Sequence, residues 1–136
     1  MAADHEMRLK EIIAAINSHD IERVLSLFAD DFLYEEVAAD STVTRNKDEL
    51  HARFQNLFSS IPDLKVELTS YFASGNNICV EWISSGTHTG DMPGFPATGK
   101  NFSYREVVVI ELIGDKLSRF SLYCDLLTVM RQLGLA

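Results

Sequence analysis

The sequence contains little cysteine, little basic charge and no long apolar run. Its two cysteines, Cys79 and Cys124, lack the paired spacing of metal or redox sites, which predicts free, buried thiols in a reducing cytosol. Lysine and arginine number 12 against 20 acidic residues. The net charge of −8 argues against nucleic acid or an anionic membrane as a partner, because both require a basic face.

No stretch approaches the roughly 18 apolar residues of a membrane helix. Residues 1–6 are polar and acidic and lack the basic-then-apolar pattern of a signal peptide. These absences predict a cytoplasmic protein. What is present is ordinary for a folded domain, since 46% of the 136 residues are apolar and 24% are charged. We expect a single domain over residues 1–136 with one core.

Apolar residues recur at helical spacing in four segments. These segments lie at about residues 3–18, 20–28, 46–61 and 126–135. Asp20 is expected to cap the second. Asn46, with Glu49 three positions later, opens the third in the manner of a capping box, and Pro62 ends it.

Strand-like segments fill the rest of the chain. They lie at Phe32–Val37, Thr42–Thr44, Leu64–Ser74, Ile78–His88, Phe102–Ile113 and Leu117–Asp125, with a polar turn between the first two. The last four follow one another, mostly with short turns, which predicts antiparallel pairing. This order is typical of the α+β class, with helices packed on one face of a curved antiparallel sheet. The sheet would enclose a cone-shaped interior, and such concavities bind small ligands.

The register of the last two strands decides which side chains meet. A two-residue loop at 114–115 places Asp125 opposite Tyr104. It also places Tyr123 opposite Glu106, so one face would hold two carboxylates and two phenols, a setting that raises a carboxylate pKa by desolvation. The opposite face is assigned to Arg105, Val107, Val109, Phe120, Leu122 and Cys124. A one-residue bulge would change this grouping, and Asp125 alternatively caps the last helix.

Four stretches resemble the SnoaL-like polyketide cyclases, a family within the superfamily of nuclear transport factor 2 and ketosteroid isomerase. They are Ala15-Ile16-Asn17-Ser18-His19-Asp20, Leu27-Phe28-Ala29-Asp30-Asp31-Phe32, Gly86-Thr87-His88-Thr89-Gly90 with residues 94–100, and the closing stretch from Tyr123-Cys124-Asp125 to Arg131-Gln132-Leu133-Gly134. Together they span nearly the whole chain. The resemblance implies the cone-shaped fold of that superfamily.

The resemblance also implies chemistry at particular positions. Asp125 matches the aspartate that acts as general acid and base when these cyclases close a ring by an aldol reaction. Glu36 corresponds to the base of the ketosteroid isomerases, but their oxyanion-binding tyrosine corresponds to Ile12, which argues against isomerase activity. The epoxide hydrolases of this fold combine aspartates with an arginine. Arg105, on the opposite face from Asp125 in our register, does not fit that set.

We therefore predict a small-molecule site for an apolar or polycyclic ligand, with no cofactor and no metal ion. The predicted catalytic residues are Asp125, Glu106 and Glu36, and the predicted ligand contacts are Tyr104, Tyr123, Trp82, Tyr34, Phe102 and His88. An aldol-type cyclase, or a related lyase or isomerase, is the favoured function. Two alternatives stay open: a non-catalytic carrier of an apolar metabolite, and a dimeric interaction module. The resemblance implies a homodimer that pairs through the sheet.

Overall fold

The computed structural model describes residues 2–38, 42–92 and 94–136. The expected polar turn between the first two strands falls largely on residues 39–41, outside the described residues. The helices are α1 (Ala2–Ser18), α2 (Ile21–Leu25), α3 (Lys47–Ser60) and α4 (Leu126–Gln132). The strands are β1 (Phe28–Glu36), β2 (Thr42–Thr44), β3 (Lys65–Ser74), β4 (Asn77–Thr87), β5 (Asn101–Ile113) and β6 (Lys116–Cys124).

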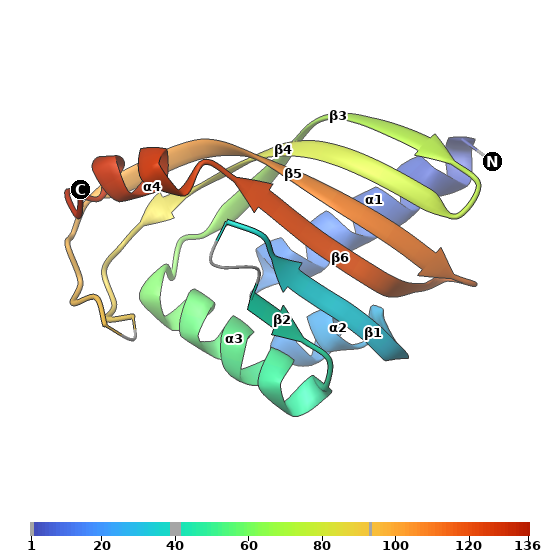
Figure 1. Cartoon of the computed structure of the whole chain (residues 1–136), viewed down its shortest axis with the longest axis horizontal. Helices are drawn as coiled ribbons and strands as arrows, with labels where there is room; N and C mark the ends of the chain where they lie inside the picture. Colours follow the sequence, from blue (N-terminus) through green and yellow to red (C-terminus); the bar gives the residue numbers. More distant parts are fainter. Residues whose placement is uncertain (1, 39–41, 93) are drawn as a thin grey trace.

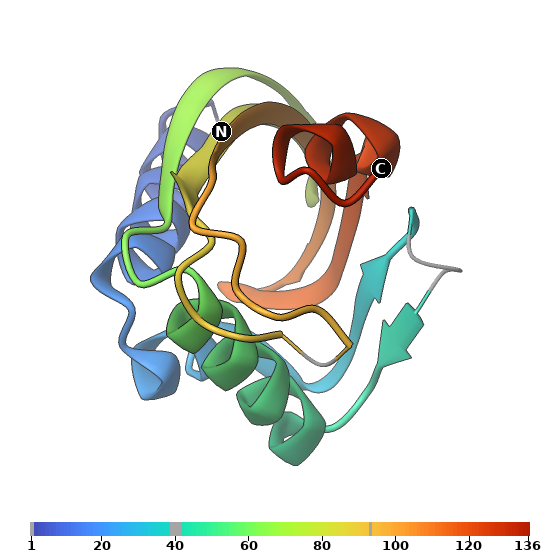
Figure 2. The same cartoon turned by 90° about the vertical axis from the view of Figure 1, so that its left-hand side faces the viewer.

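The six strands form one curved sheet in the order β2-β1-β6-β5-β4-β3. The sheet arches over the helices without closing on itself, and α4 lies across one end of the arc (Figures 1 and 2). The α+β class and the cone are therefore confirmed. One pair departs from the expected antiparallel sheet, because β1 runs parallel to β6. Short turns impose antiparallel pairing only on consecutive strands, and these two are far apart in the sequence.

Local signals set the helix starts. Asn46 accepts a hydrogen bond from the Glu49 N–H at 2.9 Å, and Asp20 accepts one from the Arg23 N–H at 3.2 Å, so both predicted caps are confirmed. The second helix is shorter than predicted. It ends at Leu25, and Phe28 already belongs to β1, where its ring packs 5.1 Å from that of Phe32. Tertiary packing here outweighs the helical spacing of the sequence.

The predicted register of β5 and β6 holds only next to the turn. Ile113 pairs with Lys116, as expected for a two-residue loop. Beyond Glu111, Ser118 is an extra residue on β6, a β-bulge that moves all later partners by one position. Because side chains alternate between the two faces of a strand, the bulge exchanges the faces of β6. Phe120, Leu122 and Cys124 therefore join Tyr104 and Glu106 on the inner face, and the predicted grouping is wrong for this strand.

An aromatic cluster fills the base of the cone. It consists of Phe28, Phe32, Tyr34, Phe54, Phe58, Trp82 and Phe120, all buried. At its centre the ring of Phe120 stacks on Tyr34 at 5.3 Å and tilts against Trp82 at 6.1 Å. Aromatic pairs at these distances stabilise a core by more than the burial of their surface area alone.

Within the described residues, no helix has the length and apolar content needed to cross a membrane.

Candidate functional site

Glu106 is a carboxylate in the interior of the cone. It lies on the inner face of β5, opposite Trp82 on β4, and only 6% of its surface is exposed. The indole Nε1 of Trp82 donates a hydrogen bond to Glu106 Oε1 at 2.8 Å, and the Tyr104 hydroxyl donates a second. Burial, and to a smaller extent the negative charge of Glu36, raise the pKa of Glu106 to about 7, against the lowering effect of these donors. Near neutral pH this carboxyl can both accept and return a proton.

A second polar group lies at the end of β1. Tyr34 and Glu36 point to the same face of the strand, and the Tyr34 hydroxyl donates to Glu36 Oε1 at 3.4 Å. Arg53 of α3 reaches the same oxygen, with its Nη1 3.4 Å away, and its guanidinium carbon lies 5.8 Å from the centre of the Tyr34 ring. Burial, followed by the charges of Glu36 and Glu106, raises the pKa of Tyr34 well above its usual value. The phenol therefore stays protonated and remains a hydrogen-bond donor.

Apolar and weakly polar side chains surround the carboxyl of Glu106. Phe102 packs 5.5 Å from Tyr104 along the same face of β5. Cys124 lies directly opposite Glu106 on β6, and burial raises the pKa of its thiol to about 11. The thiol is therefore neutral at physiological pH, not a thiolate nucleophile. The site combines flat aromatic surfaces with a titratable carboxyl.

His88 extends the inner face of β4 toward the loop of residues 89–100. It is fully buried. Its backbone N–H donates a hydrogen bond to the Lys100 carbonyl at 2.9 Å, and its ring Nδ1 lies 3.2 Å from Thr98 Oγ1. Its Nε2 has no hydrogen-bond partner among the described residues. His88, predicted as a ligand contact, is thus a buried residue that anchors this loop.

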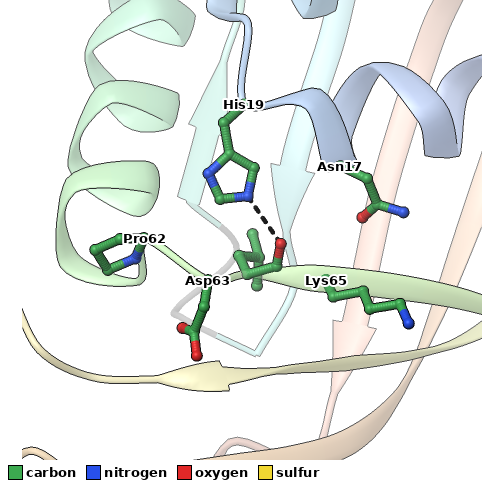
Figure 3. A pocket seen from close by; sticks show the side chains of 6 residues that line it. Asn17, His19, Pro62, Asp63 and Lys65 are labelled. Carbon is green, nitrogen blue, oxygen red and sulfur yellow. Dashed lines mark hydrogen bonds between the residues drawn. The ribbon is translucent and has the colours of Figure 1, made fainter.

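Two surface hollows lie outside the cone. The first is lined by Asn17, His19, Pro62, Asp63, Leu64 and Lys65 (Figure 3). There His19 Nε2 bonds to the Leu64 carbonyl at 2.8 Å, and Asn17 pairs with the backbone of Val66, so these polar groups are used structurally. The second is lined by Glu22, Leu25, Ser26, Lys47, Asp48 and His51. In the part of the chain that is described, no three histidine, cysteine, aspartate or glutamate side chains form a group suited to a metal ion.

Comparison with known proteins decides the family. The sequence profile of the SnoaL-like polyketide cyclases matches residues 6–133, nearly the entire chain. The chain belongs to the SnoaL-like polyketide cyclase family. The resemblance noted in the sequence is therefore confirmed. No curated protein matches this SnoaL-like chain in sequence.

Solved structures share the fold of this SnoaL-like protein at low sequence identity. AclR of Streptomyces galilaeus, a suggested hydroxylase, has a TM-score of 0.84 at 19% identity, and the match covers 98% of this chain and 87% of AclR. IdmH of Streptomyces antibioticus, a suggested polyketide cyclase, has a TM-score of 0.79 at 21% identity over 95% and 97% of the chains. A Catenulispora acidiphila protein with a ketosteroid isomerase-like fold, solved with trimethylamine, has a TM-score of 0.82 at 18% identity over 95% and 93%.

The placement of Asp125 differs from the sequence prediction. Its side chain is exposed and caps α4, accepting hydrogen bonds from the N–H of Thr128 at 3.2 Å and from the Thr128 hydroxyl at 2.7 Å. These bonds lower its pKa, the opposite of the predicted rise. The alternative prediction, that Asp125 caps the last helix, is confirmed. Tyr123 also lies away from the cone, since it pairs with Val107 on the outer face.

Six of the nine predicted site residues line the inner face of the sheet: Glu36, Glu106, Tyr34, Tyr104, Trp82 and Phe102. Sequence reasoning missed two residues of the site, one on this face and one on α3. Cys124 was assigned to the outer face because the bulge was not foreseen. Arg53 follows Leu50 by three positions, so the helical spacing of α3 already placed it beside the buried stripe. That spacing was the signal that could have found it.

Proposed function

We propose that this SnoaL-like protein is a cofactor-independent acid–base catalyst that acts on a small carbonyl compound, with Glu106 as the general base. The observation that most strongly supports this function is the buried carboxyl of Glu106, whose pKa is raised to about 7. A carboxyl with this pKa is ionised often enough to remove a proton at neutral pH and basic enough to do so efficiently. Family membership supports the proposal, because the reaction named for the family is a cyclisation.

The proposed reaction is an intramolecular aldol closure. The Glu106 carboxylate takes the proton from a carbon next to a carbonyl group, and the electron pair of that C–H bond forms an enolate. The enolate carbon then attacks a second carbonyl carbon of the same molecule, which forms a C–C bond and leaves an alkoxide. The protonated Glu106 returns its proton to the alkoxide, so the enzyme ends unchanged.

The aromatic surfaces support an apolar, ring-containing ligand. Phe102 packs against Tyr104 at 5.5 Å, and Trp82 bonds to the Glu106 carboxyl, so aromatic rings adjoin the base, and aromatic walls favour planar substrates. The competing proposal is a non-catalytic binder of the same ligand class. A binder needs the walls of the cone but has no use for a buried carboxyl that titrates near neutral pH. The two proposals therefore differ in one measurable property, proton transfer.

Hydrogen exchange at carbon tests the proposal without knowledge of the natural substrate. 1-Tetralone, a planar ketone with exchangeable α-hydrogens, is incubated with the protein in deuterated buffer, and deuterium uptake is followed by NMR. We expect uptake above the buffer rate that rises with pH through about 7 and then levels off, because only the ionised Glu106 accepts a proton. Saturable binding of tetralone with exchange at the buffer rate would favour the binder.

We also propose that two copies of the chain pair through the outer face of the sheet. Apolar side chains form two cross-strand rows there: Phe72, Cys79 and Val109 in one, and Val107 with Tyr123 in the other, with Ile83 one position further along β4. Phe72 is 72% exposed and Tyr123 40%. Charged side chains also lie on this face: Glu81 accepts a hydrogen bond from the Ser70 hydroxyl at 2.7 Å, and Glu67 and Arg105 flank Ile83. A second copy with the same surface would cover both apolar rows symmetrically.

Replacement of Tyr123 by aspartate is expected to dissociate this pair. The new carboxylate would be buried without a partner in the interface, and its desolvation opposes association. Light scattering after size-exclusion chromatography measures the mass, which should fall from two chains to one. Phe95→Asp, in the loop of residues 89–100, is the control that should remain dimeric. A wild-type protein of single-chain mass at micromolar concentration would contradict the proposal.

A further inference from the structure

Two hydrogen-bond donors converge on a single oxygen atom at the rim of the cone. The Tyr34 hydroxyl and Arg53 Nη1 each lie 3.4 Å from Glu36 Oε1, one from β1 and the other from α3. Both distances are long for charge-assisted bonds, which usually measure about 2.5–2.9 Å. Glu36 Oε1 is thus an anionic oxygen held loosely between a phenol and a guanidinium.

The two donors are more enclosed than the acceptor. The ring of Tyr34 is buried and stacked on Phe120, and Arg53 is tied to β2 by a hydrogen bond from its Nε to Thr44 Oγ1. The side chain of Glu36, in contrast, is 37% exposed at the end of β1. Enclosed donors that face a more exposed anionic oxygen are the arrangement expected of a preorganised oxyanion site.

We propose that Tyr34 and Arg53 form the oxyanion site of this protein, and that Glu36 Oε1 occupies the position of the substrate's enolate oxygen. The inference rests on the proposed function, since the enolate arises when Glu106 removes a proton. On binding, the carbonyl oxygen of the substrate replaces Glu36 Oε1, and the Glu36 side chain turns toward solvent. The two donors then stabilise the negative charge that develops on this oxygen.

The geometry of the sheet supports this assignment. Tyr34 pairs with Phe120 and Glu36 with Leu122 on β6, while Glu106 pairs with Cys124 further along the same strand. The backbones of Glu36 and Glu106 are therefore separated by two strand spacings across the sheet and two residues along it, a distance of about 12 Å. Both groups point inward from a curved sheet. On this assignment the substrate spans the two groups, with its carbonyl oxygen at one and its α-carbon at the other.

The site selects substrates that can place negative charge on oxygen. Ketones and 1,3-dicarbonyl compounds meet this requirement, because removal of their α-proton gives an enolate. The electrostatic cost of this ion is offset by the positive charge of Arg53. Glu36 acts as a competitor for the donors, so its removal should strengthen the binding of an oxyanion.

A naphthol probe tests the proposal directly. 2-Naphthol can bind as the naphtholate, a planar oxyanion with its own fluorescence, whereas 2-methoxynaphthalene has the same shape but cannot ionise. The measurements use the Glu106→Gln variant, in which glutamine imitates the protonated base. Between residue 106 and the bound naphtholate, only the naphtholate then carries a negative charge. In this background, Arg53→Gln should weaken naphtholate binding by about 10-fold or more, as loss of an ionic hydrogen bond predicts, and change 2-methoxynaphthalene binding less than about twofold.

Further variants separate an oxyanion site from a structural role. Arg53→Lys should restore part of the naphtholate affinity because it retains the charge, and Tyr34→Phe should weaken it. Glu36→Gln should strengthen it, since the donors lose their competing carboxylate. Arg8→Gln is the matched control, because Arg8 is also a helical arginine paired with a glutamate, Glu11, at 2.6 Å, but lies on α1 away from these donors. It should leave both affinities unchanged.

Three results would overturn the oxyanion site. They are an equal loss of both probes in Arg53→Gln, naphtholate binding that is unaffected by this change, and weaker naphtholate binding in Glu36→Gln. Absence of naphtholate binding in the Glu106→Gln background would overturn it as well. Failure of the proposed base is a separate observation, since it shows as unaltered tetralone exchange in Glu106→Gln and does not depend on the naphthol measurements.

Discussion

Replacement of Glu106 by glutamine is expected to lower the rate of tetralone exchange by about 100-fold or more, the usual contribution of a positioned general base. Glutamine has nearly the same shape and can still accept the hydrogen bond from Trp82 Nε1, which measures 2.8 Å in the wild type. It cannot accept the substrate proton. Deuterium uptake by NMR measures the rate, and binding of 2-methoxynaphthalene shows that the cone is intact. A variant that retains more than half of the wild-type rate would contradict the role of Glu106.

Asp125→Asn is the control for the carboxyl at the end of β6. Asparagine caps helices about as well as aspartate, so α4 should keep its start at Leu126. Because the Asp125 side chain is exposed and engaged in capping α4, tetralone exchange should remain close to the wild-type rate. A large loss in Asp125→Asn, with little loss in Glu106→Gln, would restore Asp125 as the catalytic carboxyl.

The pH dependence of stability gives a second readout for Glu106. Its pKa is about 7 in the folded chain and 4.5 in an unperturbed glutamate. Between these values the unfolded chain releases the proton while the folded chain keeps it, so stability falls as the pH rises. The loss amounts to about 3 kcal/mol above pH 7. Glu106→Gln lacks this loss, and its stability relative to the wild type should therefore increase from pH 4.5 to pH 7.

Replacement of Phe120 by alanine is expected to lower the free energy of unfolding by about 3–5 kcal/mol, the range for a buried phenylalanine. Phe120 is 3% exposed, and its ring contacts Phe28, Tyr34 and Trp82. The change would leave a cavity among rings that are held on β1 and β4. Chemical denaturation followed by the fluorescence of the single tryptophan measures the loss.

Phe72→Ala is the matched control for this change. The same side chain is removed, but Phe72 is 72% exposed on the outer face, so the expected effect is within about 0.5 kcal/mol. Under the proposed pairing of two copies, the comparison is made at a protein concentration low enough for single chains. A loss at Phe120 no larger than that at Phe72 would mean that the aromatic cluster does not stabilise the cone.

Features that depend on neighbouring residues could be predicted from the sequence. The start of α3 at Asn46 needs only an acceptor and an N–H three residues later. The turn between β5 and β6 needs only two residues between apolar runs, and Ile113 and Lys116 pair as expected. Glu106 was placed on the inner face of β5 by the alternation of its own strand, which no distant segment alters.

Features that depend on pairing between distant segments could not be predicted. The bulge at Ser118 has no local sequence signal, and this single extra residue moved Cys124 into the cone and Tyr123 out of it. The meeting of Tyr34 and Arg53 at Glu36 Oε1 requires the packing of α3 beside β1. The sequence by itself therefore determined the elements, their caps and the presence of an inward-facing carboxyl at Glu106. Only the tertiary structure decided its neighbours and its pKa, because both follow from register and burial, which arise when segments far apart in the chain come together.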